Sequence, residues 1–228
     1  RMFKYPFKNS VQDCIKYISE DHISKKVDLS EAVFGYTSDN NLRGRVHFGN
    51  AFCCEEVNCE EKKEYILAQP HASYYPLYLK QENNVISNYS SDNVQIAGRK
   101  RYRVSKNGNV WNQLNGNDNE NVRSRFRPIP SNHTFICKVR VHNLRKVEIG
   151  ALLSSFTFNK TEGTFHNLGL AKSFGFGAFS CKVKMSEEFK YNFSEYLSSF
   201  NGEISCFLQM NDKKLRNEEN LNSLVEIA

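Results

Sequence analysis

Two adjacent stretches, HTFICKVRVH (residues 133–142) and VEIGALLSSFTF (residues 147–158), decide the fold class. In the first stretch apolar and polar residues alternate, which is the period of a half-buried β-strand. In the second stretch the apolar residues recur every three or four positions, which is typical of one face of a helix, at Ile149, Leu152, Leu153 and Phe156. A strand followed by such a helix predicts a domain that combines α and β structure.

Weaker patterns on both sides predict the remaining elements. We expect helices from Ser10 to about Glu20, from Asp28 to Phe34, and over 187–200, and strands over 42–48, 178–184 and 204–210. The order helix, strand, strand, helix, strand is that of a ferredoxin-like β-α-β-β-α-β unit without its first strand. The fold prediction is therefore α+β and ferredoxin-like, with one domain over 1–228 and a long, irregular inserted loop region over 51–131 that includes an extended loop at 66–79. Because the first strand is missing, we expect it to come from upstream sequence, with this chain as the C-terminal part of a longer protein, or from another chain.

The composition narrows the class of protein. No apolar run approaches the roughly 18 residues that a membrane-spanning helix needs, so we expect no membrane partner. The seven cysteines are an odd number without the spacing of a disulfide framework, which favours a reducing, cytoplasmic location. His47, Cys53, Cys54 and Cys59 lack the paired C-x-x-C spacing of zinc modules, so no metal site and no cofactor are predicted.

Basic residues concentrate in one segment. The net charge is +6, and the segment 99–127 alone contains eight basic residues against Asp118 and Glu120. The eight are Arg99, Lys100, Arg101, Arg103, Lys106, Arg123, Arg125 and Arg127. Tyr102 and Phe126 lie among them, and this mixture of cations and rings is typical of proteins that bind phosphates and unpaired bases. A solvated basic loop is the alternative interpretation.

The predicted sheet face that points away from the helices is also basic. At alternate positions of three strands we count Arg43, Arg45, His47, Lys138, Arg140, His142, Lys182 and Lys184. An ordinary solvated face is the alternative, but such a face usually mixes charges of both signs, and no acidic residue occurs at these positions. We therefore interpret this face as a candidate RNA-binding surface.

A glycine-punctuated loop, LGLAKSFGFG (residues 168–177), precedes the last predicted strand. Gly169, Gly175 and Gly177 would allow backbone N–H groups to approach phosphates, and Lys172 adds a positive charge. The loop has neither the P-loop spacing nor G-x-G-x-x-G, and a tight turn would explain its glycines without a ligand. His166 beside the loop is the candidate general base if the protein cleaves RNA, with a structural histidine as the alternative.

Several of these pieces resemble the RAMP superfamily of CRISPR-associated proteins, particularly the backbone-type subunits of type III effector complexes. The similar pieces occur in the family's order: VFGY (33–36) with LRGRVHFGNA (42–51), AQPHASYYPLYL (68–79), AGRKRY (97–102), GALL (150–153) and FHNLGLAKSFGFG (165–177). The last contains the superfamily's glycine-rich loop, although Ala171 replaces a glycine of the pattern and Ser173 a proline. In related subunits the acidic residue that supports target-RNA cleavage lies in the family's upstream region, so the resemblance assigns no catalytic residue to this sequence.

The resemblance implies a function in antiviral defence. It implies a cytoplasmic ribonucleoprotein subunit that holds CRISPR guide RNA mainly through phosphates and sugars, next to other effector subunits, with target RNA as a further candidate ligand. Two alternatives stay open. One is a metal-independent endoribonuclease that processes the CRISPR transcript, and the other is a structural partner that does not contact RNA.

Overall fold

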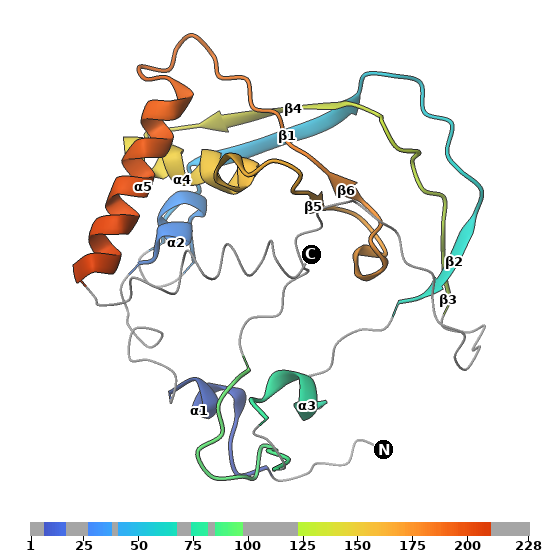
Figure 1. Cartoon of the computed structure of the whole chain (residues 1–228), viewed down its shortest axis with the longest axis vertical. Coiled ribbons are helices and arrows are strands. Elements are labelled where there is room, and N and C mark those ends of the chain that lie inside the picture. The colour runs from blue at the N-terminus through green and yellow to red at the C-terminus, as the bar shows by residue number, and fades with distance from the viewer. Residues whose placement is uncertain are drawn as a thin grey trace. The chain divides into compact units, whose positions relative to one another are not determined.

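The computed structural model describes residues 7–16, 27–37, 41–67, 74–81, 85–97 and 123–210 and divides the chain into two compact units (Figure 1). The first unit comprises Arg1–Val27 and Ala68–Arg101, and the second comprises Asp28–Leu67 and Tyr102–Ala228. The described residues form helices and small antiparallel sheets, as the α+β class predicts. The predicted insertion 51–131 contributes to both units, and its status as an insertion in one domain stays a prediction.

The first unit is built around a small apolar core. Helices α1 (Val11–Lys16) and α3 (Tyr75–Tyr78) accompany a core of four buried side chains, Cys14, Leu79, Tyr89 and Val94. The prediction of a purely extended loop over 66–79 is wrong at α3, where a proline occupies the first helical turn that tolerates its missing N–H.

The main sheet of the second unit pairs β1 (Val46–Cys53) with β4 (Phe135–Val141) in antiparallel orientation. Strand β4 confirms the prediction from the 133–142 stretch. Strand β1 begins later than the predicted strand over 42–48, because Leu42 instead forms a bridge with Tyr36. It also continues beyond the predicted end, to Cys53. A bulge between Phe48 and Ala51 shifts the register of β1 against β4.

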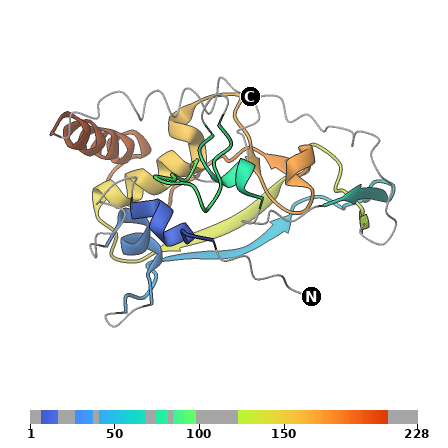
Figure 2. The same cartoon turned by 90° about the horizontal axis from the view of Figure 1, so that it is seen from below.

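Helices cover one face of this sheet (Figure 2). Helix α2 (Leu29–Phe34) begins at a capping box formed by Asp28 and Glu31 and ends at Gly35, as predicted. Helix α4 (Lys146–Thr157) confirms the second decisive stretch, and its Leu152 joins Val33 and Val46 in a buried cluster.

Helix α5 (Phe193–Met210) packs against α4. The helices approach closely at Gly150, where a Cβ atom would lie 2.2 Å from the Tyr196 carbonyl oxygen. The helix predicted over 187–200 is confirmed over residues 193–200, although it begins later, after Asn192. The strand predicted over 204–210 is wrong, because α5 continues through Ile204 to Met210. The reason for its start is a capping box, in which the side chains of Asn192 and Glu195 accept hydrogen bonds from each other's backbone N–H at 2.9 Å.

Two further small sheets complete the described structure. Strand β2 (Lys63–Ile66) pairs with β3 (Arg123–Phe126), and β5 (His166–Asn167) pairs with β6 (Ala178–Phe179). Two 3-10 turns, η3 (Phe158–Lys160) and η4 (Lys172–Phe174), lie near β5 and β6 in the sequence. The predicted strand over 178–184 is a ladder for only two residues, so the three predicted strands form no continuous sheet within the described ranges.

Candidate nucleic-acid interface

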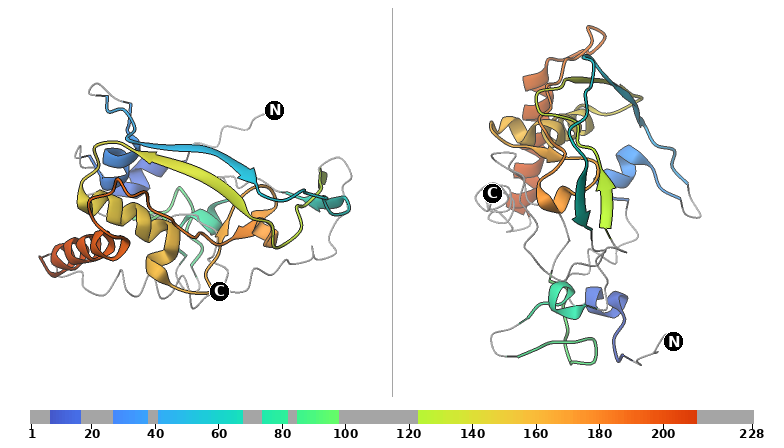
Figure 3. Two further views of the ribbon diagram at one scale, coloured as in Figure 1. Left: turned by 90° about the horizontal axis from the view of Figure 1, so that it is seen from above. Right: turned by 90° about the vertical axis from the view of Figure 1, so that its right-hand side faces the viewer.

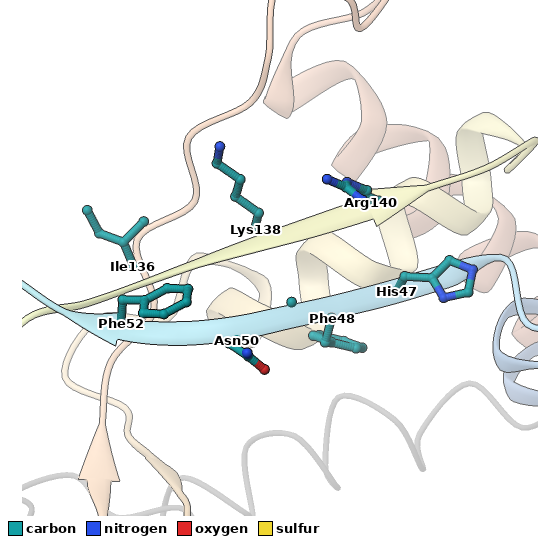
Figure 4. A pocket seen from close by; sticks show the side chains of 8 residues that line it. His47, Phe48, Asn50, Phe52, Ile136, Lys138 and Arg140 are labelled. Carbon is teal, nitrogen blue, oxygen red and sulfur yellow. The ribbon is translucent and has the colours of Figure 1, made fainter.

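The outer face of β1 and β4 is the candidate interface. Val139 and Val141 pack toward α4, so Lys138 and Arg140, which alternate with them, project from the opposite face. His47 lies directly across from Arg140 in the ladder. Figure 4 shows Ile136, Lys138 and Arg140 on the same side of β4.

An exposed aromatic ring lies at one end of this face. Phe52 is paired with Ile136 across the ladder, and their exposed fractions are 69% and 60%. Both side chains line a hollow of about 490 Å³, which Lys138 and Arg140 also line. Its lining contains no carboxylate and comprises His47, Phe48, Gly49, Asn50, Phe52, Ile136, Lys138 and Arg140. Such a surface can attract phosphates by its positive charge, and its exposed aromatic ring can stack on an unpaired base.

The apolar half of this surface, Phe52 and Ile136, was not predicted from the sequence. The predicted strand ended at Phe48, and a continuous alternation from Val46 would place Phe52 toward the helices. The bulge inserts a residue into β1 and turns Phe52 to the outer face. The pair Gly49-Asn50, which interrupts the apolar alternation, is the signal from which a bulge could be suspected.

Arg45 lies elsewhere than predicted. Its guanidinium donates to both carboxylate oxygens of Glu148, at 2.5 and 3.1 Å, and to the Ala32 and Asn143 carbonyl oxygens. Its side chain is only 20% exposed, so it connects α2 to α4 rather than presenting charge to RNA. Arg43, in contrast, is exposed.

The same ion pair controls the ionisation of Glu148. Burial by itself would raise the pKa of this carboxyl, but the hydrogen bonds from Arg45 and from the Arg145 backbone N–H lower the pKa below its ordinary value. Glu148 is therefore a carboxylate at neutral pH, paired with Arg45 inside the second unit.

The arginines of β3 are partly neutralised. Glu64 on the neighbouring strand β2 binds Arg123 at 3.2 Å and Arg125 at 2.9 Å. Glu64 lies outside the segment 99–127 whose charges were counted. The pairing of β2 with β3 brings it next to Arg123, which follows it by 59 residues in the sequence. Arg127, just beyond β3, is exposed.

Contacts within the glycine loop itself hold most of its glycines and its lysine in place. The Gly175 N–H donates to the Lys172 carbonyl oxygen, and a Cβ at Gly177 would lie 1.7 Å from the Leu168 carbonyl oxygen. The Lys172 ammonium donates to the Gly169 carbonyl oxygen at 2.9 Å. Gly169, at φ +88°, has no atom within 4 Å of its Cβ position, whereas Gly175 is buried. The structure therefore supports the tight-turn interpretation for Gly177 and Gly175.

An aromatic cluster fixes this loop to β2 and β3. The Tyr65 ring lies 4.8 Å from Phe174 and 5.3 Å from Phe176, and Phe126 lies 5.1 Å from Phe176. Tyr65 is 9% exposed. The cluster joins the glycine loop to the strand that carries Arg123 and Arg125.

His166 is held by its surroundings. Its Nε2 donates to the Phe156 carbonyl oxygen at 2.9 Å, and its ring stacks on Phe158 with centroids 4.1 Å apart. Phe179 lies on another side at 5.3 Å. These contacts explain the position of His166 by packing and hydrogen bonding alone, which is what a structural histidine would show.

Some predicted site residues lie outside the described residues: Arg99, Lys100, Arg101 and Arg103. Lys182 and Lys184 are exposed in the segment that follows β6. Throughout the part of the chain that the structure describes, no three His, Cys, Asp or Glu side chains come together as metal ligands. No helix there combines the length and apolar character that a bilayer crossing requires.

Comparison with known proteins gives no assignment. No protein-family model matches this chain, and no curated protein matches it.

Proposed function

We propose that this protein binds single-stranded RNA across the outer face of β1 and β4. The observation that supports the proposal best is the hollow that Lys138, Arg140 and Phe52 line together, without a carboxylate in the lining. The two cations attract phosphates, and the exposed ring stacks on an unpaired base whatever its sequence. A duplex hides the faces of its bases, so the surface favours single strands.

Other exposed groups extend the proposed contact. Gly169 has open space around its Cβ position at the glycine loop, and Arg43 and Arg127 are exposed cations of the same unit. Contacts of this kind reach phosphates and sugars, which suits a protein that must accept many sequences.

The resemblance to the RAMP superfamily extends the proposal to a biological role. On this basis the RNA is CRISPR guide RNA, and the protein is a subunit of a cytoplasmic type III effector ribonucleoprotein beside other effector subunits. The fold that goes with this role is ferredoxin-like. The succession of α2, β1, β4 and α4, with β2, α3 and β3 between β1 and β4, supports this part of the proposal.

Replacement of Phe52 tests the proposal. Phe52→Ala should weaken binding of a single-stranded RNA by about 5- to 150-fold, the equivalent of about 1–3 kcal/mol for one stacked base. Tyr74→Ala removes another exposed ring, 59% exposed in the first unit, and should leave the affinity unchanged. Equal affinities for the parent protein and Phe52→Ala would contradict the proposal.

The same RNA tests the alternative of an endoribonuclease. We expect the RNA to stay intact in the presence of a chelator, because the His166 ring is held by Phe156 and Phe158. Cleavage at one position that survives His166→Ala would assign the activity to another residue.

A further inference from the structure

The strand pairs β1–β4 and β2–β3 belong to one long two-stranded ribbon. β1 leads into β2, and β3 leads into β4. The two connecting segments stay side by side. The Cys54 N–H donates to the Thr134 carbonyl oxygen at 2.9 Å, and the Glu60 N–H donates to the Pro128 carbonyl oxygen at 2.9 Å. Figure 3 (left) shows β2 beyond the end of the β1–β4 pair. The ribbon therefore continues from the end at which Phe52 lies to the arginines of β3.

The two arms of this ribbon differ in charge. The arm from β1 to β2, residues 46–66, contains five glutamates and two lysines. The arm from β3 to β4, residues 123–140, contains no acidic residue. A polyanion that leaves the hollow is therefore attracted along the second arm, toward β3. The lysines and arginines of this arm are Arg123, Arg125, Arg127, Lys138 and Arg140.

At β3 one carboxylate lies between two guanidinium groups. The Arg125 Nε binds one carboxylate oxygen of Glu64 at 2.9 Å, and an Arg123 Nη binds the other oxygen at 3.2 Å. Guanidinium groups bind carboxylates and phosphates through the same planar arrangement of N–H donors. The arrangement that holds Glu64 therefore also suits a phosphate.

Water reaches these ion pairs, so an anion from solution can replace the carboxylate. The side chains of Glu64 and Arg125 are 33% and 56% exposed. Ion pairs in contact with water contribute little to stability, so their separation costs little. The pair of Arg45 with Glu148 is different, because its carboxylate is only 9% exposed. Two guanidinium groups against one carboxylate also leave a positive charge at β3 that attracts a phosphate.

We propose that Arg123 and Arg125 form a second phosphate site for the RNA, and that Glu64 occupies this site until RNA displaces it. The inference rests on RNA binding as the proposed function and adds the path of the strand. The RNA leaves the hollow past Phe52 and follows the basic arm to β3. Its contacts at β3 are to phosphates, so the site accepts any base. Glu64 lowers the affinity, because its carboxylate has to leave first.

The length of the arm sets the length of RNA that reaches both sites. Arg125 and Ile136 are 11 residues apart in the sequence. An extended chain covers at most about 3.5 Å per residue, so the two positions lie within about 40 Å of each other. A strand with stacked bases advances about 3.4 Å per nucleotide, so about 12 nucleotides cover this distance. An RNA of about 20 nucleotides therefore spans the hollow and the second site.

A 20-nucleotide oligouridylate tests the arginine pair. Arg125→Gln should lower the slope of log K against log salt by about 0.7, the value for one lost phosphate contact. Arg125→Lys keeps the charge and should keep the parent slope. Thermal melts of both variants check that the protein stays folded. A parent slope in Arg125→Gln would overturn the second site.

The same RNA tests the role of Glu64. Glu64→Gln should raise the affinity by about two- to fivefold, because no carboxylate has to be displaced. Glu61→Gln is the matched control, since it removes the same charge from an exposed position of the same arm. It should leave the affinity within about 1.5-fold of the parent value, because salt screens its charge. Equal affinities for Glu64→Gln and Glu61→Gln would overturn displacement of Glu64.

Phe52→Ala distinguishes failure of this inference from failure of the proposed function. Weaker binding by Phe52→Ala, together with a parent slope in Arg125→Gln, would refute the second site and leave binding at the hollow intact. Parent affinity in Phe52→Ala, together with a lower slope in Arg125→Gln, would refute the hollow and retain the phosphate site at β3.

Discussion

At the residue scale, the buried ion pair between Arg45 and Glu148 is the clearest departure from the predicted site. Arg45→Ala should destabilise the second unit by about 3–5 kcal/mol at neutral pH, because it leaves a carboxylate that is 9% exposed without its partner. Chemical denaturation of the parent and the variant measures the difference. Arg43→Ala, which removes an exposed arginine two residues away, is the matched control and should change stability by less than about 0.5 kcal/mol.

The effect of Arg45→Ala should depend on pH. The folded-state pKa of Glu148 lies below its ordinary value of 4.5, so the ion pair contributes its full stability above pH 4.5. This contribution is lost as the pH falls through the folded pKa and Glu148 becomes protonated. The difference between parent and variant should therefore shrink below pH 4.5. A constant difference down to about pH 2 would show that Arg45 acts by packing alone.

Substitutions at Gly177 and Gly169 should differ in their effect on stability. Gly177→Ala should destabilise the loop strongly, because its Cβ would lie 1.7 Å from a backbone oxygen at φ +71°. Gly169→Ala meets open space and should cost only about 1 kcal/mol, for its positive φ. Thermal melts of both variants, with RNA affinity measured on the folded protein, separate stability from binding. Equal melting temperatures for the two variants would contradict this geometry.

At the element scale, the aromatic cluster around Tyr65 should hold the glycine loop on β2 and β3. Tyr65→Ala should cost about 3–5 kcal/mol, as for other large aromatic truncations in a core. It should also make residues 168–177 sensitive to limited proteolysis. Leu170→Ala, in the same loop but 61% exposed, should do neither. Unchanged proteolysis in Tyr65→Ala would mean that the loop holds its own conformation.

Elements with a local signal were predictable from the sequence. Strand β4 and helix α4 have the right apolar period, and α2 has its capping residues in the sequence. Helix α5 was misjudged because the pattern of phenylalanines continued upstream of the capping box at Asn192, which sets the start. Only part of the candidate surface could be predicted. The alternation of residues along β4 predicts that Lys138 and Arg140 face outward, whereas the outward direction of Phe52 depends on the bulge in β1. The neutralisation of Arg45 and Arg125 depends on carboxylates that only the folded chain brings near.

At the scale of the whole molecule, two compact units with separate cores should respond separately to damage. Leu79 is 1% exposed in the first unit, so Leu79→Ala should destabilise that unit by about 2–5 kcal/mol. Hydrogen exchange should then accelerate over residues 74–97 and stay unchanged in β4 and α4. Acceleration in both units would show that the chain unfolds as one cooperative body.

If RNA lies on the outer face of β1 and β4, the cations of that face should contribute to the salt dependence of single-stranded RNA affinity. The double variant Lys138→Gln/Arg140→Gln should lower the slope of log K against log salt by about 1.4, or about 0.7 for each phosphate contact. The control Lys160→Gln/Lys190→Gln removes the same charge near Phe193 and Tyr191, away from this face, and should keep the parent slope. A parent slope in the first variant, or an equal loss in both variants, would contradict RNA binding at the outer face of β1 and β4.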